Sequence, residues 1–433
     1  MRHAQTHVLE GMNPADLQAL VEKHLPAEPR RLLSQISRAA EAHALPVYLV
    51  GGFVRDLLLG RPADARAASR WDFDFVVDGD APALARALAR ELGGEVVVHT
   101  PFKTATWTAP SGAATDFATA RMETYPLPGA LPVVAPAPIA DDLRRRDFTV
   151  NAMALRVDGR RFGELLDPHG GQADLAARVI RVLHPLSFQD DPTRMFRAAR
   201  YEQRLDFNIA RETLALIPGA WDSLAALTGD RMRHEFALIF RETKASAMLT
   251  RLGELDILRR VHPSLHWGAK ESARAEAIAQ LPVADWRVAP SPEPDAFYFA
   301  LMLGESDAAQ VESALARLNV NREVFQAVAE AVALRAGWAR ASEATAALDQ
   351  SSELGVMAAY VLYDEARANL HDYLARWRFV RAETTGDDLI ALGLTPGPGF
   401  KKILWSLRAA RLDGEVADAS GERALLTRLL QSG

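Results

Sequence analysis

The sequence predicts an α/β domain near its beginning, followed by an all-helical remainder. Two observations predict this division. Short apolar runs alternate with helical patterns over the first 120 residues, which is typical of a mixed α/β domain. From about residue 172 onward strand patterns vanish, and Ala/Leu/Arg-rich helical patterns dominate to the end, broken by Pro-containing linkers such as APSPEPD (289–295).

The elements of the α/β domain can be assigned in order. Residues 28–45 predict an amphipathic helix, and PVYLV (46–50) predicts a strand that Gly51-Gly52 stops. After them come a short helix, VRDLLLG (54–60), a loop, RPADARAASR, and the strand WDFDFVV (71–77). The remaining elements are the helix APALARALARELGG (81–94), with its glycine stop, and the strands EVVVH, KTATWTA and ATDFATA.

Length and composition bound the class of protein. A chain of 433 residues is too long for one core, so two to four domains are expected. The absence of cysteine excludes disulfides, thiol catalysis and Cys-ligated zinc, and it fits a reducing compartment. The first residues, MRHAQTHVLEGMNPADLQAL, have no apolar core of the signal-peptide type, and no apolar run approaches the roughly 18 residues of a spanning helix. We therefore expect a soluble, cytoplasmic protein with no membrane partner.

The charge balance limits the partners. A net charge of −6 argues against indiscriminate nucleic-acid binding, although it leaves a local basic surface open. Most basic residues are arginine and alanine is abundant, as a GC-rich genome produces. The arginine content alone therefore does not indicate an RNA-binding protein.

The Gly-Gly turn is the first candidate for chemistry. Gly51 and Gly52 stand between a strand and a helix, where glycine lets the backbone approach a ligand and a helix N-terminus favours an anion. Arg55 lies one turn into that helix, near the same point. Tight turns use Gly-Gly constantly, so this segment alone does not separate a phosphate site from an ordinary turn.

WDFDFVV places two aspartates in an otherwise apolar strand. Because side chains alternate along a strand, the aromatic residues share one face, and Asp72 and Asp74 share the other. Two carboxylates on one face can hold one or two Mg²⁺ ions, which clamp the oxygens of a phosphoryl displacement. An edge strand with a solvated acidic face explains the pair equally well, but the upstream Gly-Gly unit favours the metal site. Asp116, in ATDFATARMETY, is a candidate third carboxylate.

The segment DDLRRRDFTVNAMAL (141–155) carries three consecutive arginines before Asp147. Arg146 is a candidate contact for a triphosphate or a base, with Asp147 and Asn151 fixing the local geometry. A helix terminus with ordinary surface charges is the alternative.

A periodic set of charges marks the segment LHPLSFQDDPTRMFRAARYEQRLDF (183–207). Pro192 opens a helix in which charged residues recur every three positions, so they sweep one half of the helix. These residues are Asp191, Arg194, Arg197 and Arg200. The other half carries Met195, Phe196 and Ala199, which can be buried.

Asp191 and Arg194 are close neighbours in this pattern, and together they could recognise a nucleotide base. The carboxylate accepts from an amino group while the guanidinium donates to ring acceptors, a combination that favours cytosine and adenine over uracil and guanine. An intrahelical salt bridge on a solvated face is the alternative.

Together these segments resemble the class II tRNA nucleotidyltransferase and bacterial poly(A) polymerase family, part of the polymerase-β-like nucleotidyltransferase superfamily. LVGGFVRDLLLG with WDFDFVV resembles its first motif, RRDFTVNAMA its second, and SFQDDPTRMFRAARY its base-template motif, usually Glu-Asp-x-x-Arg. LTGDRMRHEFALIF (227–240) resembles the next helix of the neck, and DLIALGLTPGPGFKKILWSLRAARLDGEV (388–416) is similar to the tail. The resemblance is strong over roughly 46–240, recognisable at 388–416 and thin between.

The resemblance implies a seahorse-shaped molecule in which a polymerase-β-like α/β head precedes an all-α neck, body and tail. The corresponding segments are a catalytic head (26–157), a base-recognising neck (158–240), and a tRNA-binding body (241–380) and tail (381–433). It further implies Mg²⁺-dependent addition of CMP or AMP, from CTP or ATP, to a tRNA 3′ end, with release of pyrophosphate.

The site residues follow from the same resemblance. Asp72 and Asp74 match the metal ligands, and Arg146 matches the nucleotide-binding arginine of the second motif. Gly52 and Arg55 match triphosphate contacts beside Gly51. The template-helix positions are Asp191, Arg194, Arg197 and Arg200. One position departs from the family, because Asp190 stands where the family usually has Glu.

The resemblance leaves the added nucleotides open. The segment METYPLPGALPVVAPAPIADD (122–142) covers the region where full CCA-adding relatives carry a flexible loop, and its Pro/Ala-rich character favours a CC-adding or A-adding enzyme. Two other hypotheses stay open. A poly(A) polymerase shares the same head, and an inactive RNA-binding protein could retain the same fold.

Overall fold

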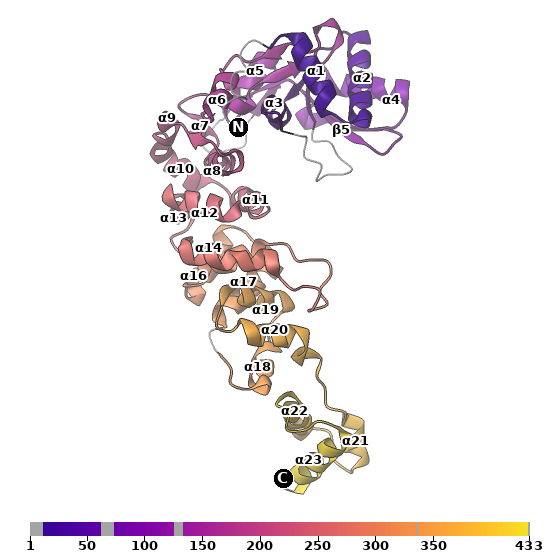
Figure 1. The fold of residues 1–433 in the computed structure, drawn as a ribbon, viewed down its shortest axis with the longest axis vertical. Helices are drawn as coiled ribbons and strands as arrows, with labels where there is room; N and C mark the ends of the chain where they lie inside the picture. Colours follow the sequence, from indigo (N-terminus) through magenta and orange to yellow (C-terminus); the bar gives the residue numbers. More distant parts are fainter. Residues whose placement is uncertain (1–11, 62–72, 125–132, 335–336, 432–433) are drawn as a thin grey trace. The chain divides into compact units, whose positions relative to one another are not determined.

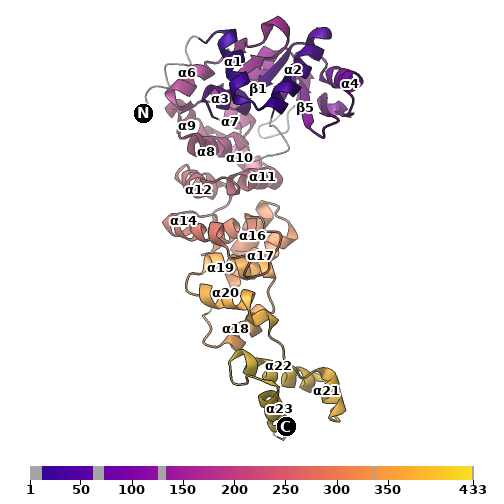
Figure 2. The same cartoon turned by 45° about the vertical axis from the view of Figure 1, so that its right-hand side comes forward.

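The computed structural model describes residues 12–61, 73–124, 133–334 and 337–431. They form two compact units, which divide between Leu227 and Thr228. The first unit combines a mixed β-sheet with helices, and the elements labelled α11 to α23 in the second unit are all helices (Figures 1 and 2). This confirms the predicted division into an α/β part and a helical remainder.

A seven-stranded sheet organises the first unit. Its strand order is β3-β4-β5-β2-β1-β8-β9; β2 and β5 run parallel and the other neighbouring pairs are antiparallel. The strands are β1 (Val47–Val50), β2 (Asp74–Val77), β3 (Glu95–His99), β4 (Thr104–Thr108), β5 (Ala114–Thr119), β8 (Ala154–Arg156) and β9 (Leu165–Leu166). A separate hairpin consists of β6 (Arg121–Thr124) and β7 (Val133–Pro136).

The two faces of this sheet differ as the alternation in the sequence predicts. Phe73 and Phe75 are buried on one face, while Asp74 between them is exposed on the other. Phe75 stacks on Phe117 of β5 with ring centroids 5.3 Å apart. Trp71 and Asp72, the remaining residues of the predicted strand pattern, lie outside the described residues. The alternation is thus confirmed from residue 73 onward.

Helix α5 (Ile139–Arg144) covers part of the face that carries Asp74. Its Ile139 and Leu143 pack in one apolar cluster with Val50 and Val76 of the sheet. The end of α5 therefore lies beside the exposed part of this face. The consecutive arginines 144–146 are the last residue of α5 and the two that follow it.

The helices of the first unit largely follow the sequence prediction. They are α1 (Pro14–His24), α2 (Ala27–Ala42), α3 (Gly52–Leu58), α4 (Ala81–Leu92), α5, α6 (Gly171–Ala177), α7 (Ser187–Asp190), α8 (Thr193–Leu205), α9 (Arg211–Leu214) and α10 (Trp221–Ala226). Helix α4 is capped by the Asp80 side chain and ends at Gly93, whose φ of +78° favours glycine. Gly94 follows at φ +94°, and a Cβ there would lie 2.2 Å from the carbonyl oxygen of Thr108.

The structure corrects one detail of the strand prediction. Strand patterns vanish after residue 172, yet β10 (Val179–Ile180) pairs in parallel with β11 (Asn208–Ile209). Two residues per strand are too few to produce an alternating pattern, and the pairing joins segments that α8 separates in the sequence. Local sequence therefore carries no signal for this small sheet.

Helices build the second unit. They are α11 (Gly229–Phe240), α12 (Ala245–Glu254), α13 (Ile257–Val261), α14 (Ala269–Ala275), α15 (Asp295–Leu303), α16 (Ala308–Arg317), α17 (Arg322–Ala333), α18 (Ala341–Leu348), α19 (Glu353–Leu362), α20 (Arg367–Ala375), α21 (Gly386–Ala391), α22 (Pro398–Leu412) and α23 (Ala419–Gln431). Helices α15 and α19 are buried along most of their length. No helix in the described segments is long and apolar enough to cross a membrane.

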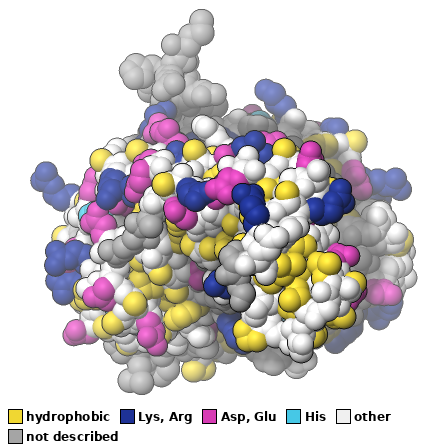
Figure 3. Space-filling view, turned by 90° about the horizontal axis from the view of Figure 1, so that it is seen from below, with side chains coloured by type: hydrophobic (Ala, Val, Ile, Leu, Met, Phe, Trp, Pro, Cys, Tyr) yellow, Lys and Arg dark blue, Asp and Glu magenta, His cyan; other side chains and the backbone are white. Residues whose placement is uncertain are grey.

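Charges of both signs are distributed over the surface. On the face drawn in Figure 3, Lys and Arg side chains are interspersed with Asp and Glu side chains. This agrees with the slightly acidic composition, and any nucleic-acid contact there must use local groups of residues.

A buried carboxylate holds the last helices together. Glu422 of α23 is almost completely buried, and it accepts hydrogen bonds from the backbone N–H groups of Glu383 (3.1 Å) and Thr384 (2.7 Å) and from Arg411 of α22. Burial alone would raise the pKa of Glu422, but the hydrogen bonds from Thr384, Glu383 and Arg411 outweigh it and lower this pKa to about 2.

Replacing Glu422 with glutamine is therefore expected to destabilise these helices by about 2 kcal/mol at pH 7. Because the folded-state pKa is depressed, the charge-dependent stabilisation is present above the unfolded-state pKa and disappears as pH falls from about 4.5 to about 2. Hydrogen exchange at the Thr384 amide in wild type and Glu422→Gln, measured against pH, checks this. An exchange difference that does not change between pH 7 and pH 3 would contradict it.

Candidate active site

A pocket of about 420 Å³ opens on the exposed face of the sheet. Strands β2, β4 and β5 form its floor, and the arginines after α5 line one side. Its charged and polar lining residues include Asp74, His99, Thr104, Thr106, Asp116, Arg121, Arg145 and Arg146. Acidic groups on the floor beside basic groups on the wall suit a ligand that carries both a cation and phosphates.

Asp74 and the candidate third carboxylate, Asp116, meet on this floor. The two residues are register partners on the parallel strands β2 and β5, and both side chains are exposed while their sequence neighbours Phe75 and Phe117 are buried. Thr106 of β4 is the register partner of Asp116 on the other side, and its hydroxyl donates a 2.5 Å hydrogen bond to Asp116 Oδ1. This bond fixes the orientation of the Asp116 carboxylate.

The Gly-Gly turn lies directly against these groups. Gly51 has a φ of +70°, and a Cβ built on it would lie 3.2 Å from Arg146 Nη1 and 3.5 Å from Asp74 Oδ2. The turn, Asp74 and Arg146 therefore meet at one point, although they are far apart in the sequence. Gly52 is the first residue of α3, where a Cβ would lie 3.5 Å from Arg55 Nη2.

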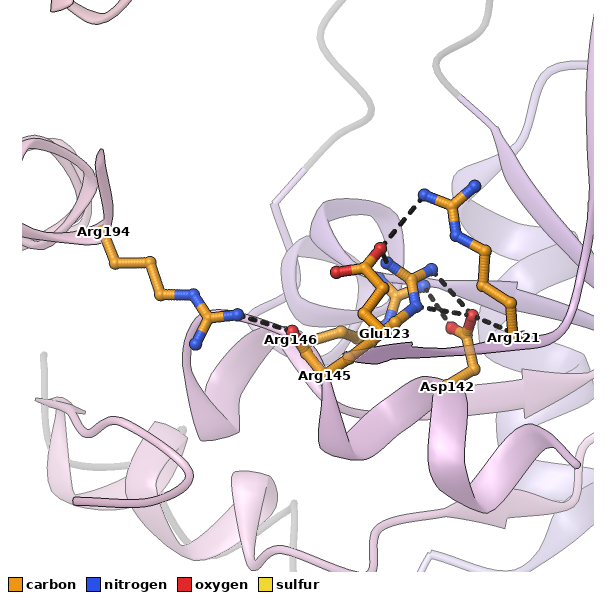
Figure 4. Close-up of polar contacts among 6 residues, drawn as sticks. All are labelled: Arg121, Glu123, Asp142, Arg145, Arg146 and Arg194. Atoms are coloured by element: carbon orange, nitrogen blue, oxygen red, sulfur yellow. Dashed lines mark hydrogen bonds and ion pairs between the residues drawn. The ribbon is translucent and has the colours of Figure 1, made fainter. Parts of the chain in front are cut away.

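A buried acidic residue organises the arginines of the wall (Figure 4). Asp142 of α5 is completely buried; it accepts hydrogen bonds from Arg145 through Oδ1 (2.7 Å) and from Arg146 through Oδ2 (3.1 Å). Arg145 also pairs with Glu123 (2.9 Å), which in turn pairs with Arg121 (3.2 Å). Nε of Arg121 and Nε of Arg146 are buried without a hydrogen-bond partner. The cluster thus holds three guanidinium groups with two carboxylates, which leaves it net positive beside the pocket.

A second network joins three of the predicted motifs. Arg55 is buried; it pairs with Asp56 and donates a 2.7 Å hydrogen bond to Asn151 Oδ1. Asn151 Nδ2 donates to Asp147 (3.0 Å), and Asp147 forms an ion pair with Arg197 of α8 (2.6 Å). Asp147 and Asn151 therefore fix local geometry, as predicted. A direct contact of Arg55 with a triphosphate stays a prediction, because its guanidinium is held within this network.

The charge state of Asp147 follows from its partners. Burial alone would raise the pKa of this carboxyl, but the Arg197 guanidinium and the hydrogen bond from Asn151 outweigh burial and hold the pKa below its usual range. Asp147 is thus ionised at neutral pH, and it keeps Arg197 in a fixed position.

The structure revises the predicted geometry of the template helix. Helix α8 begins at Thr193, and Asp191 precedes it in extended conformation. Asp191 Oδ1 accepts hydrogen bonds from the backbone N–H (3.1 Å) and the hydroxyl (2.6 Å) of Thr193, so Asp191 lies in the turn before the helix and not on its charged half. Asp191 is extended because it precedes Pro192, whose ring disfavours the helical conformation for the residue before it.

The three predicted site arginines of α8, Arg194, Arg197 and Arg200, also differ in exposure. The sequence places them on one half of the helix, opposite Met195, Phe196 and Ala199, but Arg194 and Arg200 are buried as well, and only Arg197 is partly exposed. Arg194 Nη1 donates to Ser187 Oγ (2.6 Å), and Nη2 donates to the carbonyl oxygen of Arg145 (2.7 Å; Figure 4). Arg194 thereby connects α7 and α8 to the wall of the pocket.

Tyr201 is a site residue that the sequence pattern does not reveal. Its ring lies close to the guanidinium groups of Arg55 (5.2 Å), Arg200 (5.5 Å) and Arg197 (5.6 Å). The sequence pattern also does not reveal Asp142 and Thr106. Each of them contacts another side chain of the site and not a ligand. The position of Asp142 three and four residues before Arg145 and Arg146 is the one local signal available.

The carboxylate oxygens of the floor have the donor chemistry of a Mg²⁺ site. The described residues contain no cluster of three or more His, Asp or Glu side chains arranged for a metal ion. Asp72, the other predicted ligand, lies outside them. Asp74 and Asp116 are therefore the two described residues whose position fits such an ion.

Comparisons with known proteins identify the family. Residues 47–181 match the model of the poly A polymerase head domain, and residues 206–267 match a model described as the probable RNA and SrmB-binding site of polymerase A. The CC-adding tRNA nucleotidyltransferase of Deinococcus radiodurans is 34% identical over 415 residues, which cover 94% of this chain and 95% of that protein. The chain belongs to the tRNA nucleotidyltransferase and poly(A) polymerase family. Among tRNA nucleotidyltransferases, the A-adding enzyme of Geobacter sulfurreducens is 35% identical over 433 residues, 95% of this chain but 48% of that protein.

The present chain spans about half the length of the first relatives that it matches. Among solved structures, an apo form of a CCA-adding enzyme aligns with a TM-score of 0.82 at 29% identity, covering 96% of this chain and 99% of that one. The Thermotoga maritima CCA-adding enzyme complexed with tRNA_CCA aligns with a TM-score of 0.76 at 28% identity, covering 96% and 98%. The tRNA nucleotidyltransferase fold thus extends over nearly the whole of this chain.

Proposed function

We propose that this protein is a Mg²⁺-dependent nucleotidyltransferase that adds CMP, AMP or both to the 3′ end of tRNA and releases pyrophosphate. The observation that carries the proposal is that Asp74, Asp116 and Arg146 line one pocket, with Gly51 directly against Asp74 and Arg146. The relatives named above support tRNA as the acceptor, because they are named for adding C, A or both to tRNA.

In this proposal the substrates are CTP or ATP and the tRNA 3′-hydroxyl. The hydroxyl oxygen attacks the α-phosphorus, a new 3′-O–P bond forms, and the bond to the β-phosphate breaks to release pyrophosphate. Asp74, Asp72 and Asp116 are the residues that would hold Mg²⁺, which, when bound, neutralises charge on the attacking and leaving oxygens. Arg146 donates to the triphosphate, and Gly51 lets the backbone lie close to it.

The other predicted contacts complete the proposed binding site. Gly52 lies beside the triphosphate, and Arg55 orients Asn151 and Asp147. The base is recognised by Asp191, in the turn before α8, and by Arg194 in the first turn of the helix. Arg197 and Arg200 are the other nucleotide-binding residues of this helix. In the wider chain we assign catalysis to residues 26–157, base recognition to 158–240, and tRNA binding to the body (241–380) and tail (381–433).

A second proposal concerns how much of the CCA end is made. Two of the relatives are named for adding a single kind of nucleotide, one as an A-adding and one as a CC-adding enzyme. The Pro/Ala-rich segment 122–142 also favours such a partial activity. Residues 125–132 of that segment lie outside the described residues.

Incorporation of labelled CTP or ATP into three tRNAs, lacking CCA, lacking CA and lacking only the final A, tests both proposals. Use of the tRNAs lacking CCA and lacking CA with CTP, without use of ATP on the tRNA lacking only the final A, indicates a CC-adding enzyme. Use of only that last tRNA, with ATP, indicates an A-adding enzyme. Product length separates these from a poly(A) polymerase, which extends unrelated RNA without stopping at one to three nucleotides. Absence of CTP or ATP binding by calorimetry, together with tight tRNA binding, would indicate an inactive RNA-binding protein.

A further inference from the structure

The second unit carries an exposed aromatic residue between two arginines. Phe379 is 44% exposed, and it is the one aromatic residue among the exposed large apolar side chains described in this unit, which also include Ile390 and Leu392. The guanidinium carbons of Arg378 and Arg287 lie 4.7 Å and 4.9 Å from the centroid of its ring. A partly exposed aromatic ring with guanidinium groups beside it offers a ligand both an apolar surface and positive charge, so this arrangement is a candidate contact surface.

The arginines around Phe379 are held by buried partners. Arg378 donates to the carbonyl oxygen of Trp286 (2.6 Å) and pairs with Glu353. Trp286 is fully buried; its Nε1–H donates to His371 (3.2 Å) and its ring packs edge-on against Tyr360 at 4.9 Å. The buried indole thus anchors the loop that presents the next residue, Arg287, over the exposed ring. The surface is therefore built in advance of any ligand.

The local charge is positive. Arg287 and Arg381 are exposed, and neither forms an ion pair with a carboxylate of the described residues. Arg381 donates to the carbonyl oxygens of Arg378 and Val380, which keeps it beside Phe379. Of the acidic groups near this point in the sequence or in contact with these arginines, Glu353 pairs with Arg378, Asp372 with Arg376 and Glu383 with Arg411, which leaves the exposed Asp285. Arg287 and Arg381 together therefore outweigh one exposed carboxylate.

We propose that these residues, Phe379 with Arg287, Arg378 and Arg381, form a binding surface for RNA, here called the Phe379 platform. An exposed aromatic ring stacks on an unpaired base, and planar guanidinium groups beside it bind phosphates or stack on bases. An acidic protein would complement the arginines but not require the exposed ring. The platform lies outside the segment that matches the RNA-binding family model, residues 206–267.

This inference rests on the proposed function, because the proposed function identifies tRNA as the RNA that binds. It predicts that a base exposed in folded tRNA stacks on Phe379 and that nearby phosphates contact Arg287 and Arg381. The platform belongs to RNA binding and not to the chemical step, so its loss should raise KM for tRNA and leave kcat at saturating tRNA unchanged.

Fluorescence anisotropy with labelled tRNA at several salt concentrations tests the platform, using the full chain with Asp74→Asn to prevent turnover. Phe379→Ala is expected to weaken binding at least about fivefold, because base–aromatic stacking contributes roughly five- to hundredfold in affinity. Phe379→Trp should keep wild-type affinity, and Phe379→Leu, which preserves apolar volume, should behave as Phe379→Ala. Arg287→Ala should reduce the slope of log affinity against log salt by about one.

Lys23→Ala, which removes an exposed positive charge from α1, outside the segments assigned to catalysis, base recognition and tRNA binding, is the matched control and should bind tRNA as wild type does. Unchanged affinity of both Phe379→Ala and Arg287→Glu would overturn the proposal, and so would a charge effect at Arg287 without any effect of Phe379→Leu. A chain that binds tRNA through Phe379 but incorporates no nucleotide would refute the proposed function while the platform stands. If the same Phe379 and Arg287 substitutions, made in the chain that keeps Asp74, leave both kcat and KM for tRNA at their wild-type values, the platform is refuted while the proposed function stands.

Discussion

Replacing Asp74 with asparagine is expected to lower kcat for nucleotide incorporation at least about a hundredfold. The substitution removes one negative charge from the pocket floor, where Asp74 and Asp116 are register partners, and an amide is a much weaker Mg²⁺ ligand than a carboxylate. Asp74 is exposed, so the free energy of unfolding should change by no more than about 0.5 kcal/mol. Single-turnover incorporation at saturating tRNA and nucleotide measures the effect, and Asp72→Asn is expected to behave alike.

A suitable control is Glu95→Gln on β3. Glu95 is an exposed carboxylate of the same sheet, but it does not line the pocket. The control should keep wild-type activity, and both aspartate variants should keep wild-type affinity for tRNA. More than a few per cent of wild-type incorporation in either aspartate variant would refute the metal-ligand assignment.

Arg194→Ala is expected to relax the choice of base. If the guanidinium reads the acceptors of cytosine or adenine, its removal should lower kcat/KM for CTP or ATP while raising the relative use of UTP and GTP. A good bidentate contact contributes about 1–3 kcal/mol of discrimination, so selectivity should fall roughly tenfold to hundredfold. Measurement of kcat/KM for all four triphosphates checks this.

The structure supplies the competing outcome. Arg194 is buried and already donates to Ser187 Oγ and to the carbonyl oxygen of Arg145, so it also has the contacts of a purely structural residue. Arg200→Ala, from the same helix, should lower kcat/KM for all four triphosphates similarly if Arg200 faces phosphate or ribose. An equal loss for all four triphosphates in Arg194→Ala, with Arg194→Lys restoring both the melting temperature and kcat/KM for all four, would show that Arg194 only holds the neck segment against the pocket wall.

Much of the site was predictable because its signals are local. The alternation in WDFDFVV identified which face of β2 carries the carboxylate, and Phe73 and Phe75 are buried while Asp74 is exposed. Asp116 was a candidate because it lies in another predicted strand of the same domain. The ordered motifs identified the family because they combine several such local patterns in a single sequence.

The sequence by itself determined the α/β start, the helical remainder, and the residue types that meet phosphates and metal ions, because those properties follow from periodicity and side-chain chemistry. Only the tertiary structure decided that Asp116 is the register partner of Asp74, that Asp142 gathers the arginines, and that Asp191 lies before α8 while Arg194 is buried. Strand order and the burial of a charged helix face depend on partners distant in sequence, and a local pattern contains no information about which distant partner it will meet. The Phe379 platform has the same origin, because Arg287 and Phe379 come together only through the buried Trp286.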